Sequence, residues 1–192
     1  MSPAVRPLAA LCTATLCALA LGACADTLQN RPIPHNILEG LIGAPVPVYW
    51  LGGSFEGMPI SEATFDPSGS YSVHYGNCLE GGQGTCVTPV RIVTSPDNSF
   101  LPGGSTPSTR TRIRGVPAVI AQAGRTIVLA TADVVVDIYA TSARAAAAAA
   151  RTAVPINVPG EPEAPLPPAL ANTGFNERPL RSQVPAPLHP LG

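Results

Sequence analysis

The sequence predicts an α+β domain, in which an antiparallel sheet of about six to seven strands packs against one Ala-rich helix. Three observations support this fold class. Short runs of β-branched and aromatic residues, bounded by Gly and Pro, recur between residues 47 and 139. Residues 142–153 have a helical composition instead. Aromatic residues make up only 5% of the 192-residue chain, so the core must consist largely of Val, Ile, Leu and Ala.

The first half of the domain contains three predicted strands. Residues 47–51 place Val, Tyr and Trp between a Pro and two Gly residues, which favours a strand. Residues 70–75 alternate between polar and apolar, as in a half-buried strand, and residues 89–93 are their expected hairpin partner. The apolar face holds Tyr71, Val73 and Tyr75, and the polar face holds Ser70, Ser72 and His74. Residues 37–42 fit either a helical turn or an entry strand, and residues 95–108 form a loop.

The second half repeats this organisation. Residues 110–117 favour a strand whose end, or whose place at a sheet edge, is marked by a Pro. Residues 119–122 and 126–130 flank a predicted turn at 123–125. Residues 133–139 are the strongest predicted strand. Its core face would hold Val134, Val136 and Ile138.

Two aspartates lie on the other face of that last strand. Asp133 and Asp137 are about 13 Å apart at about 3.3 Å per residue, too far to act as a cooperating carboxylate pair. We expect both to face solvent and to limit aggregation of the Val run between them.

A helix and a Pro-rich segment complete the chain. Ser142 is a good N-cap, and the six consecutive Ala residues that follow Arg144 have the highest helix propensity. An all-Ala face buries little surface but lets a helix approach a sheet closely. From residue 154 the hydrophobic periodicity ends and Pro is frequent, which predicts a disordered or polyproline-II tail over 154–192.

The N-terminus is typical of a bacterial export signal. Residues 1–23 combine one basic residue with an apolar run too short to span a membrane, and they end in Leu-Gly-Ala before Cys24. This pattern resembles a lipobox, which predicts a lipid-modified Cys24, a tether over 24–36 and a single domain over 37–153. Ala23-Cys24-Ala25 also fits ordinary signal peptidase, which would release a soluble protein, and an uncleaved anchor is a third reading.

Five cysteines occur in the chain, two of them within the export segment. With Cys24 assigned to the lipid, Cys78 and Cys86 remain, and an even number of thiols in an oxidising compartment predicts a disulfide. Three Gly residues between them allow the chain to turn back. No C-x-x-C pair or nearby His favours a redox or metal site instead.

Four short motifs resemble small lipoproteins of high-GC Gram-positive bacteria. They are Tyr49-Trp50-Leu51-Gly52, Tyr75-Gly76-Asn77-Cys78, Cys86 with Pro89, and Arg114-Gly115-Val116-Pro117. The resemblance covers about residues 40–153. It implies an envelope location but no activity, because the group has none assigned and no functional residue can be transferred.

No catalytic or cofactor-binding motif is present in the sequence. The closest approaches to a nucleophile elbow lack their closing Gly, and the Gly-rich turn at 81–84 is followed by no Gly-Lys-Ser/Thr. His74 is the only His of the predicted fold, and on a polar strand face we expect it to be solvated. We therefore expect no cofactor, and a net charge of −1 argues against nucleic acid as a partner.

The alternating Arg110, Arg112 and Arg114 form the strongest candidate site. Three guanidinium groups on one strand face could bind anionic headgroups, phosphate polymers or an acidic partner. The alternative is a solvated edge strand kept from pairing by its charge.

These observations predict a lipid-anchored, extracytoplasmic binding module, without enzymatic activity, for an unknown protein or envelope polymer. The alternatives are an envelope enzyme or inhibitor, or a soluble secreted protein. A pocket holding His74 with a carboxylate in hydrogen-bond reach would favour an enzyme, whereas a flat face presenting the three arginines would favour the binding module.

Overall fold

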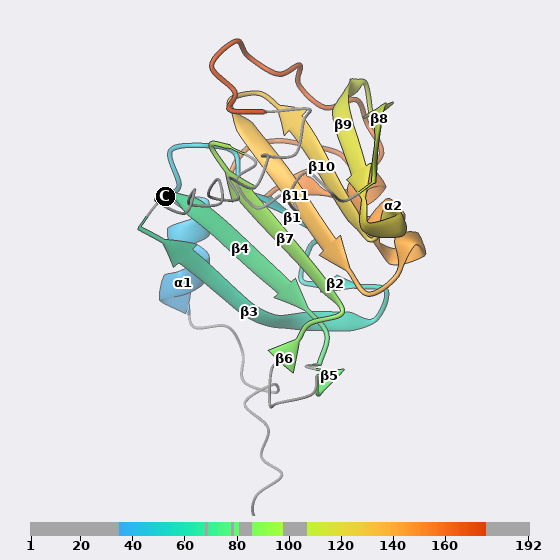
Figure 1. Ribbon diagram of the computed structural model, residues 1–192. Helices are drawn as coiled ribbons and strands as arrows, with labels where there is room; N and C mark the ends of the chain where they lie inside the picture. The colour runs from blue at the N-terminus through green and yellow to red at the C-terminus, as the bar shows by residue number, and fades with distance from the viewer. Residues whose placement is uncertain (1–34, 68, 78, 81–85, 98–106, 176–192) are drawn as a thin grey trace, which may run out of the picture. The chain divides into compact units, whose positions relative to one another are not determined.

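The centre of the domain is an antiparallel sheet of eight strands (Figure 1). The computed structural model describes residues 35–67, 69–77, 79–80, 86–97 and 107–175. The strand order is β2-β3-β4-β7-β11-β10-β9-β8. In chain order these strands are β2 (Ser54–Phe55), β3 (Met58–Asp66), β4 (Ser70–Tyr75), β7 (Val90–Ser95), β8 (Ser108–Ile113), β9 (Val116–Ala121), β10 (Thr126–Thr131) and β11 (Val134–Ala140). The predicted α+β class, with the Ala-rich helix packed on an antiparallel sheet, is confirmed.

Two helices and two short strand pairs accompany the sheet. The helices are α1 (His35–Ile42) and α2 (Ala143–Thr152), and a 3-10 turn, η3 (Gln122–Gly124), joins β9 to β10. Strand β1 (Tyr49–Trp50) pairs with β12 (Val154–Pro155), and β5 (Leu79–Glu80) pairs with β6 (Cys86–Val87). The predicted strand at 47–51 therefore exists, but it lies outside the main sheet.

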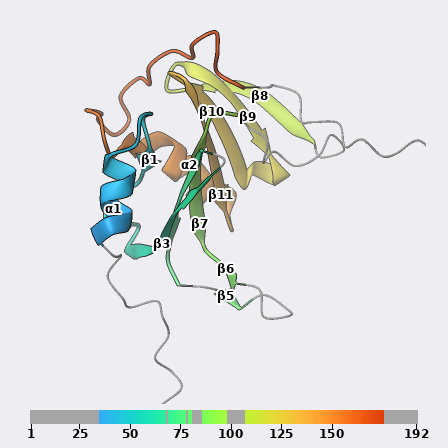
Figure 2. The ribbon, with the colours of Figure 1, turned by 90° about the vertical axis from the view of Figure 1, so that its left-hand side faces the viewer.

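The main core lies between one face of the sheet and the elements that cover it. Figure 2 shows α1, α2 and β1 on the same side of the sheet. Alternate residues of the inner strands point to this side, including Val73, Ile92 and Val136. Among the described residues, the buried members of this core lie between Leu41 and Leu166.

Helix α2 packs closely because its buried face is made of Ala. Ala146, Ala149 and Ala150 are buried against the sheet. At Gly124 in η3, a Cβ atom would lie 2.8 Å from the Cβ of Ala143, and φ is +87°. Only Gly fits this position, where the chain turns directly beneath the start of the helix.

The predicted strand at 110–117 is interrupted. Arg114 and Gly115 have φ values of +49° and +84°, and they form the turn between β8 and β9. Two successive positive φ angles are typical of the turns whose twist matches a β-hairpin. The run is therefore a hairpin rather than one strand.

The Pro-rich segment does not begin as a free tail. Residues 154–175 lie along the domain, beginning with β12 and continuing through main-chain hydrogen bonds. The N–H of Leu166 donates to the carbonyl of Arg114, and the N–H of Leu170 donates to the carbonyl of Ala132. Pro has no N–H, but the residues between the prolines supply enough donors to attach the segment to strand ends. Residues 176–192 lie outside the described residues.

Candidate functional site

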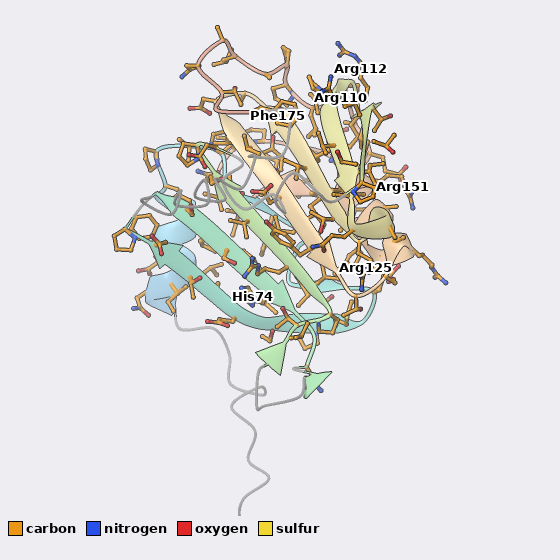
Figure 3. The ribbon with its side chains drawn as sticks, viewed as in Figure 1. His74, Arg110, Arg112, Arg125, Arg151 and Phe175 are labelled. Atoms are coloured by element: carbon orange, nitrogen blue, oxygen red, sulfur yellow. The ribbon has the colours of Figure 1, made fainter. Side chains whose placement is uncertain are left out.

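Two of the three arginines predicted to bind anions share one exposed edge of the sheet. Arg110 and Arg112 are exposed on β8, the edge strand, and their spacing places them on the same face. Figure 3 shows both side chains at the β8 side of the molecule. Arg112 Nη1 donates to the carbonyl of Gly115 at 2.9 Å, a bond that uses one of the five N–H donors of its guanidinium.

Arg114 does not join this row. It lies in the β8–β9 turn, and its guanidinium donates to three main-chain carbonyls of the C-terminal segment: Ala164 at 2.6 Å, Glu161 at 2.9 Å, and Ala153. Burial lowers the pKa of Arg114, and nearby Tyr49 and Glu163 oppose that shift. Arg114 therefore attaches the C-terminal segment to the sheet, and the flat face with three arginines expected from the sequence is not present.

The structure separates the charges of the domain into two halves. Residues 35–97 contain one Arg and six acidic residues, whereas residues 107–152 contain six Arg and two Asp. The first segment forms β2, β3, β4 and β7, and the second forms β11, β10, β9 and β8 together with α2. The net charge of −1 thus conceals an acidic half and a basic half of one sheet.

The basic half exposes five arginines: Arg110, Arg112, Arg125, Arg144 and Arg151. Within the described part of the chain, no carboxylate lies at ion-pair distance from Arg112, Arg125, Arg144 or Arg151. Of the two aspartates in this half, Asp137 is fully buried. Four of these five arginines therefore have no ion-pair partner among the described residues, and Glu163 of the C-terminal segment borders the same groove as Arg112 and Arg151.

A second candidate site surrounds His74 on the other half of the sheet. His74 Nε2 is 2.8 Å from Ser72 Oγ, and Nδ1 is 3.5 Å from Thr88 Oγ1 and 3.6 Å from Glu62 Oε2. The His74 side chain is only 16% exposed. Our expectation of a solvated His74 is therefore wrong, because β3 and the segment before β7 cover it.

A groove of about 370 Å³ contains this group. It is lined by Glu62, His74, Val87, Thr88, Arg91 and Tyr139. Burial lowers the pKa of His74, Glu62 opposes the shift, and Arg91 adds to it, so the imidazole is neutral near pH 7. Four of these residues form one row across β3, β4, β7 and β11, since Glu62 is opposite His74, His74 opposite Arg91, and Arg91 opposite Tyr139.

The same face of the sheet buries Asp137, next to this row. Its side chain is 0% exposed, and neither carboxyl oxygen has a hydrogen-bond partner among the described residues. Burial raises its pKa to about 7, Asp97 adds to the shift, and Arg91 opposes it. The predicted solvent-facing role of Asp137 is wrong, because this face of β11 is also covered: Val119, Val128 and Val135 form a second apolar cluster, with Phe175 packed on it.

The predicted lipid and disulfide sites are not tested by the structure. Cys24 and Cys78 lie outside the described residues. Cys86 begins β6, where its backbone is opposite Glu80 of β5, and the two strands are antiparallel. Among the described residues, no group of three His, Cys, Asp or Glu could hold a metal ion, and no helix is long and apolar enough to cross a bilayer.

The basic half could have been recognised from the sequence, although the patterns of single strands did not reveal it. Counting charges by segment, rather than along single strands, separates 35–97 from 107–152. The row around His74 had no comparable indication, because it depends on the register of four strands. Comparison of the chain with protein-family models, with curated proteins and with solved structures finds no match in any of the three.

Proposed function

We propose that this protein is a lipid-anchored binding module on the extracytoplasmic face of the cell membrane, and that its basic half binds a phosphate-bearing envelope polymer. The observation that supports this proposal is the group of exposed arginines on β8, after η3 and on α2. Four of them, Arg112, Arg125, Arg144 and Arg151, have no carboxylate at ion-pair distance among the described residues. Guanidinium forks bind phosphate through two parallel hydrogen bonds, which suits a repeating anionic polymer.

The location rests on the N-terminal sequence. The Leu-Gly-Ala-Cys24 motif at the end of an apolar run supports lipid attachment, and acyl chains contribute about 0.8 kcal/mol per buried methylene. Cys24→Ala is expected to abolish labelling by a radioactive fatty acid and to release the protein from membranes. A Cys24→Ala protein that stays with washed membranes would refute the anchor.

The binding proposal predicts a strong dependence on salt. Protein comprising residues 26–192, which retains the whole described core, should bind immobilised poly(glycerol phosphate) but not uncharged dextran. Arg110→Gln/Arg112→Gln/Arg151→Gln should weaken binding at least tenfold. The slope of log affinity against log salt should fall by about two to three, as expected for the loss of three phosphate contacts.

A matched control neutralises charge on the acidic half. Glu39→Gln/Glu56→Gln changes two exposed carboxylates, one on α1 and one in the β2–β3 turn at the sheet edge opposite β8, and should leave binding unweakened. Equal binding by the triple Arg variant and the unmodified protein would overturn the proposal.

A hydrolytic enzyme is the second candidate, favoured by the contacts of His74. A Ser hydroxyl on Nε2 and a carboxylate near Nδ1 are the groups that activate a nucleophilic serine. Two features weigh against it. The Glu62 contact, at 3.6 Å, is longer than a hydrogen bond, and β4 is paired on both sides, so its backbone N–H groups are not available to stabilise an oxyanion.

A fluorophosphonate probe separates the two candidates. An enzyme of this type would be labelled at Ser72, and Ser72→Ala would abolish the labelling. The binding module is expected to remain unlabelled in both forms.

A further inference from the structure

The basic half contains a groove between the β8–β9 hairpin and α2. Its volume is about 540 Å³. The floor consists of Ile113, Ile120, Ile127 and Ala147, from three adjacent strands and the helix. Ile120 and Ile127 are direct cross-strand partners, so the floor is continuous across β9 and β10.

Two exposed arginines stand at the border of this apolar floor. Arg151 lies in the last turn of α2 (Figure 3). Arg112 neighbours Ile113 on the edge strand β8, so alternation places it on the other face from the isoleucines, and it borders the groove at the open edge of the sheet. Both are outside ion-pair distance of any carboxylate in the described chain. Arg114 also borders the groove, but each nitrogen of its guanidinium already donates to one of the three carbonyls described above.

The floor favours an occupant without polar groups along its length. Strand β9 is paired with β8 on one side and β10 on the other, so its backbone donors and acceptors are already used. A peptide laid across the isoleucines would bury amides without partners, which is costly, whereas a hydrocarbon chain has no such groups. Apolar contact over the floor and ionic contact at the border together fit an amphiphile.

We propose that this groove binds a single acyl chain with an anionic head group, the chain over the isoleucines and the head group at Arg112 and Arg151. The inference rests on the proposed function, in which the basic half binds anions, and it specifies an anion that carries an acyl chain. Glu163 also borders the groove and opposes an anionic head group, so the two arginines act against one carboxylate. Removing the charge of an arginine should therefore weaken binding of an anionic head group, whereas removing the charge of Glu163 should strengthen it.

The experiment measures affinity by calorimetry, with residues 26–192 and alkyl phosphates below their micelle-forming concentration. Affinity should rise about two- to fourfold per methylene from butyl to dodecyl phosphate, as expected for partial to full burial of each group. If a carboxylate head group suffices, dodecanoate should bind as dodecyl phosphate does. If phosphate is required, only dodecyl phosphate should bind. Dodecyltrimethylammonium should bind at least tenfold more weakly than either.

Variants locate the site on the protein. Arg151→Gln should weaken binding of dodecyl phosphate about tenfold, and Glu163→Gln should strengthen it severalfold. Arg144→Gln, an exposed arginine of the same helix that does not border the groove, should have no effect. Ala147→Leu should fill part of the groove and reduce the dependence on chain length, and circular dichroism confirms that each variant is folded.

The outcomes distinguish this inference from the proposed function. Binding of poly(glycerol phosphate) together with an affinity for alkyl phosphates that does not change with chain length would overturn the groove and leave the proposed function standing. Salt-insensitive or absent binding of both anions would overturn both. An acidic peptide that binds the groove more tightly than dodecyl phosphate would overturn the assignment of an acyl chain.

Discussion

The buried carboxyl of Asp137 should make the folding stability of the domain depend on pH. Its side chain is fully buried between Val93 and Val128 of the neighbouring strands, without a hydrogen-bond partner among the described residues. Burial raises its pKa from 3.8 to about 7. The folded state therefore holds the proton more tightly than the unfolded state does.

The sign and size of the effect follow from this difference in pKa. Below about pH 3, under both pKa values, the carboxyl is neutral in the folded and the unfolded state and contributes no pH dependence. As the pH rises towards 7, the unfolded state ionises first, so stability falls by up to about 1.4 kcal/mol per pH unit. The whole loss is about 4 kcal/mol by pH 7 to 8, and about 2 kcal/mol of it falls between pH 5 and 7.

Asp137→Asn removes the titration and keeps the shape of the side chain. Urea unfolding of both proteins from pH 5 to 8, followed by the fluorescence of Trp50, the single Trp, gives the two stability curves. His74, Arg91 and Asp97 are present in both proteins, so their contributions to the free energy of unfolding largely cancel in the difference. The unmodified protein should lose about 2 kcal/mol relative to the variant between pH 5 and 7. Parallel curves would show that Asp137 is not held neutral, and the reasoning from burial would fail.

Three further predictions test the attachment of the C-terminal segment, the packing of α2 and the cysteines. Arg114→Ala should cost about 2–3 kcal/mol in urea unfolding and expose residues 154–175 to limited proteolysis, with Arg114→Lys recovering only part of the loss because it lacks the guanidinium fork; unchanged proteolysis would contradict this. Gly124→Ala should lower thermal stability by more than Gly57→Ala does, because both have a positive φ but only Gly124 also meets a neighbouring Cβ; equal losses would refute the packing argument. Cys78 and Cys86 should give no reaction in a free-thiol assay of the native protein, and two reactive thiols would exclude the disulfide.

Local patterns predicted the inner strands and the helix well. Strict alternation identified β4 at Ser70–Tyr75, and Ser142 caps α2 as expected, its Oγ accepting a hydrogen bond from the N–H of Ala145 at 3.2 Å. The same reasoning missed β3, whose residues from Met58 to Asp66 are largely exposed and lack regular alternation. It also missed the turn at Arg114, since no Asn-Gly or Asp-Gly pair marks it.

The candidate sites were less predictable than the strands that hold them. Alternation correctly placed Asp137 on the face of β11 opposite the main core, but it could not indicate that this face is covered as well. It also placed Arg114 in a row with Arg110 and Arg112, although a positive φ moves Arg114 into a turn.

The sequence by itself determined the α+β class, the alternation of the inner strands, the cap of α2 and the uneven supply of charge along the chain. These properties depend on backbone preferences and on side chains that are neighbours in sequence. Only the tertiary structure decided that β2, β3, β4 and β7 form an acidic half of the sheet and β8 to β11 a basic one. It also decided that four strands bring His74 into one row with Glu62, Arg91 and Tyr139, and that Arg114 attaches the Pro-rich segment. The physical reason is that strand order and register follow from the burial of apolar faces contributed by distant parts of the chain, which no local pattern specifies.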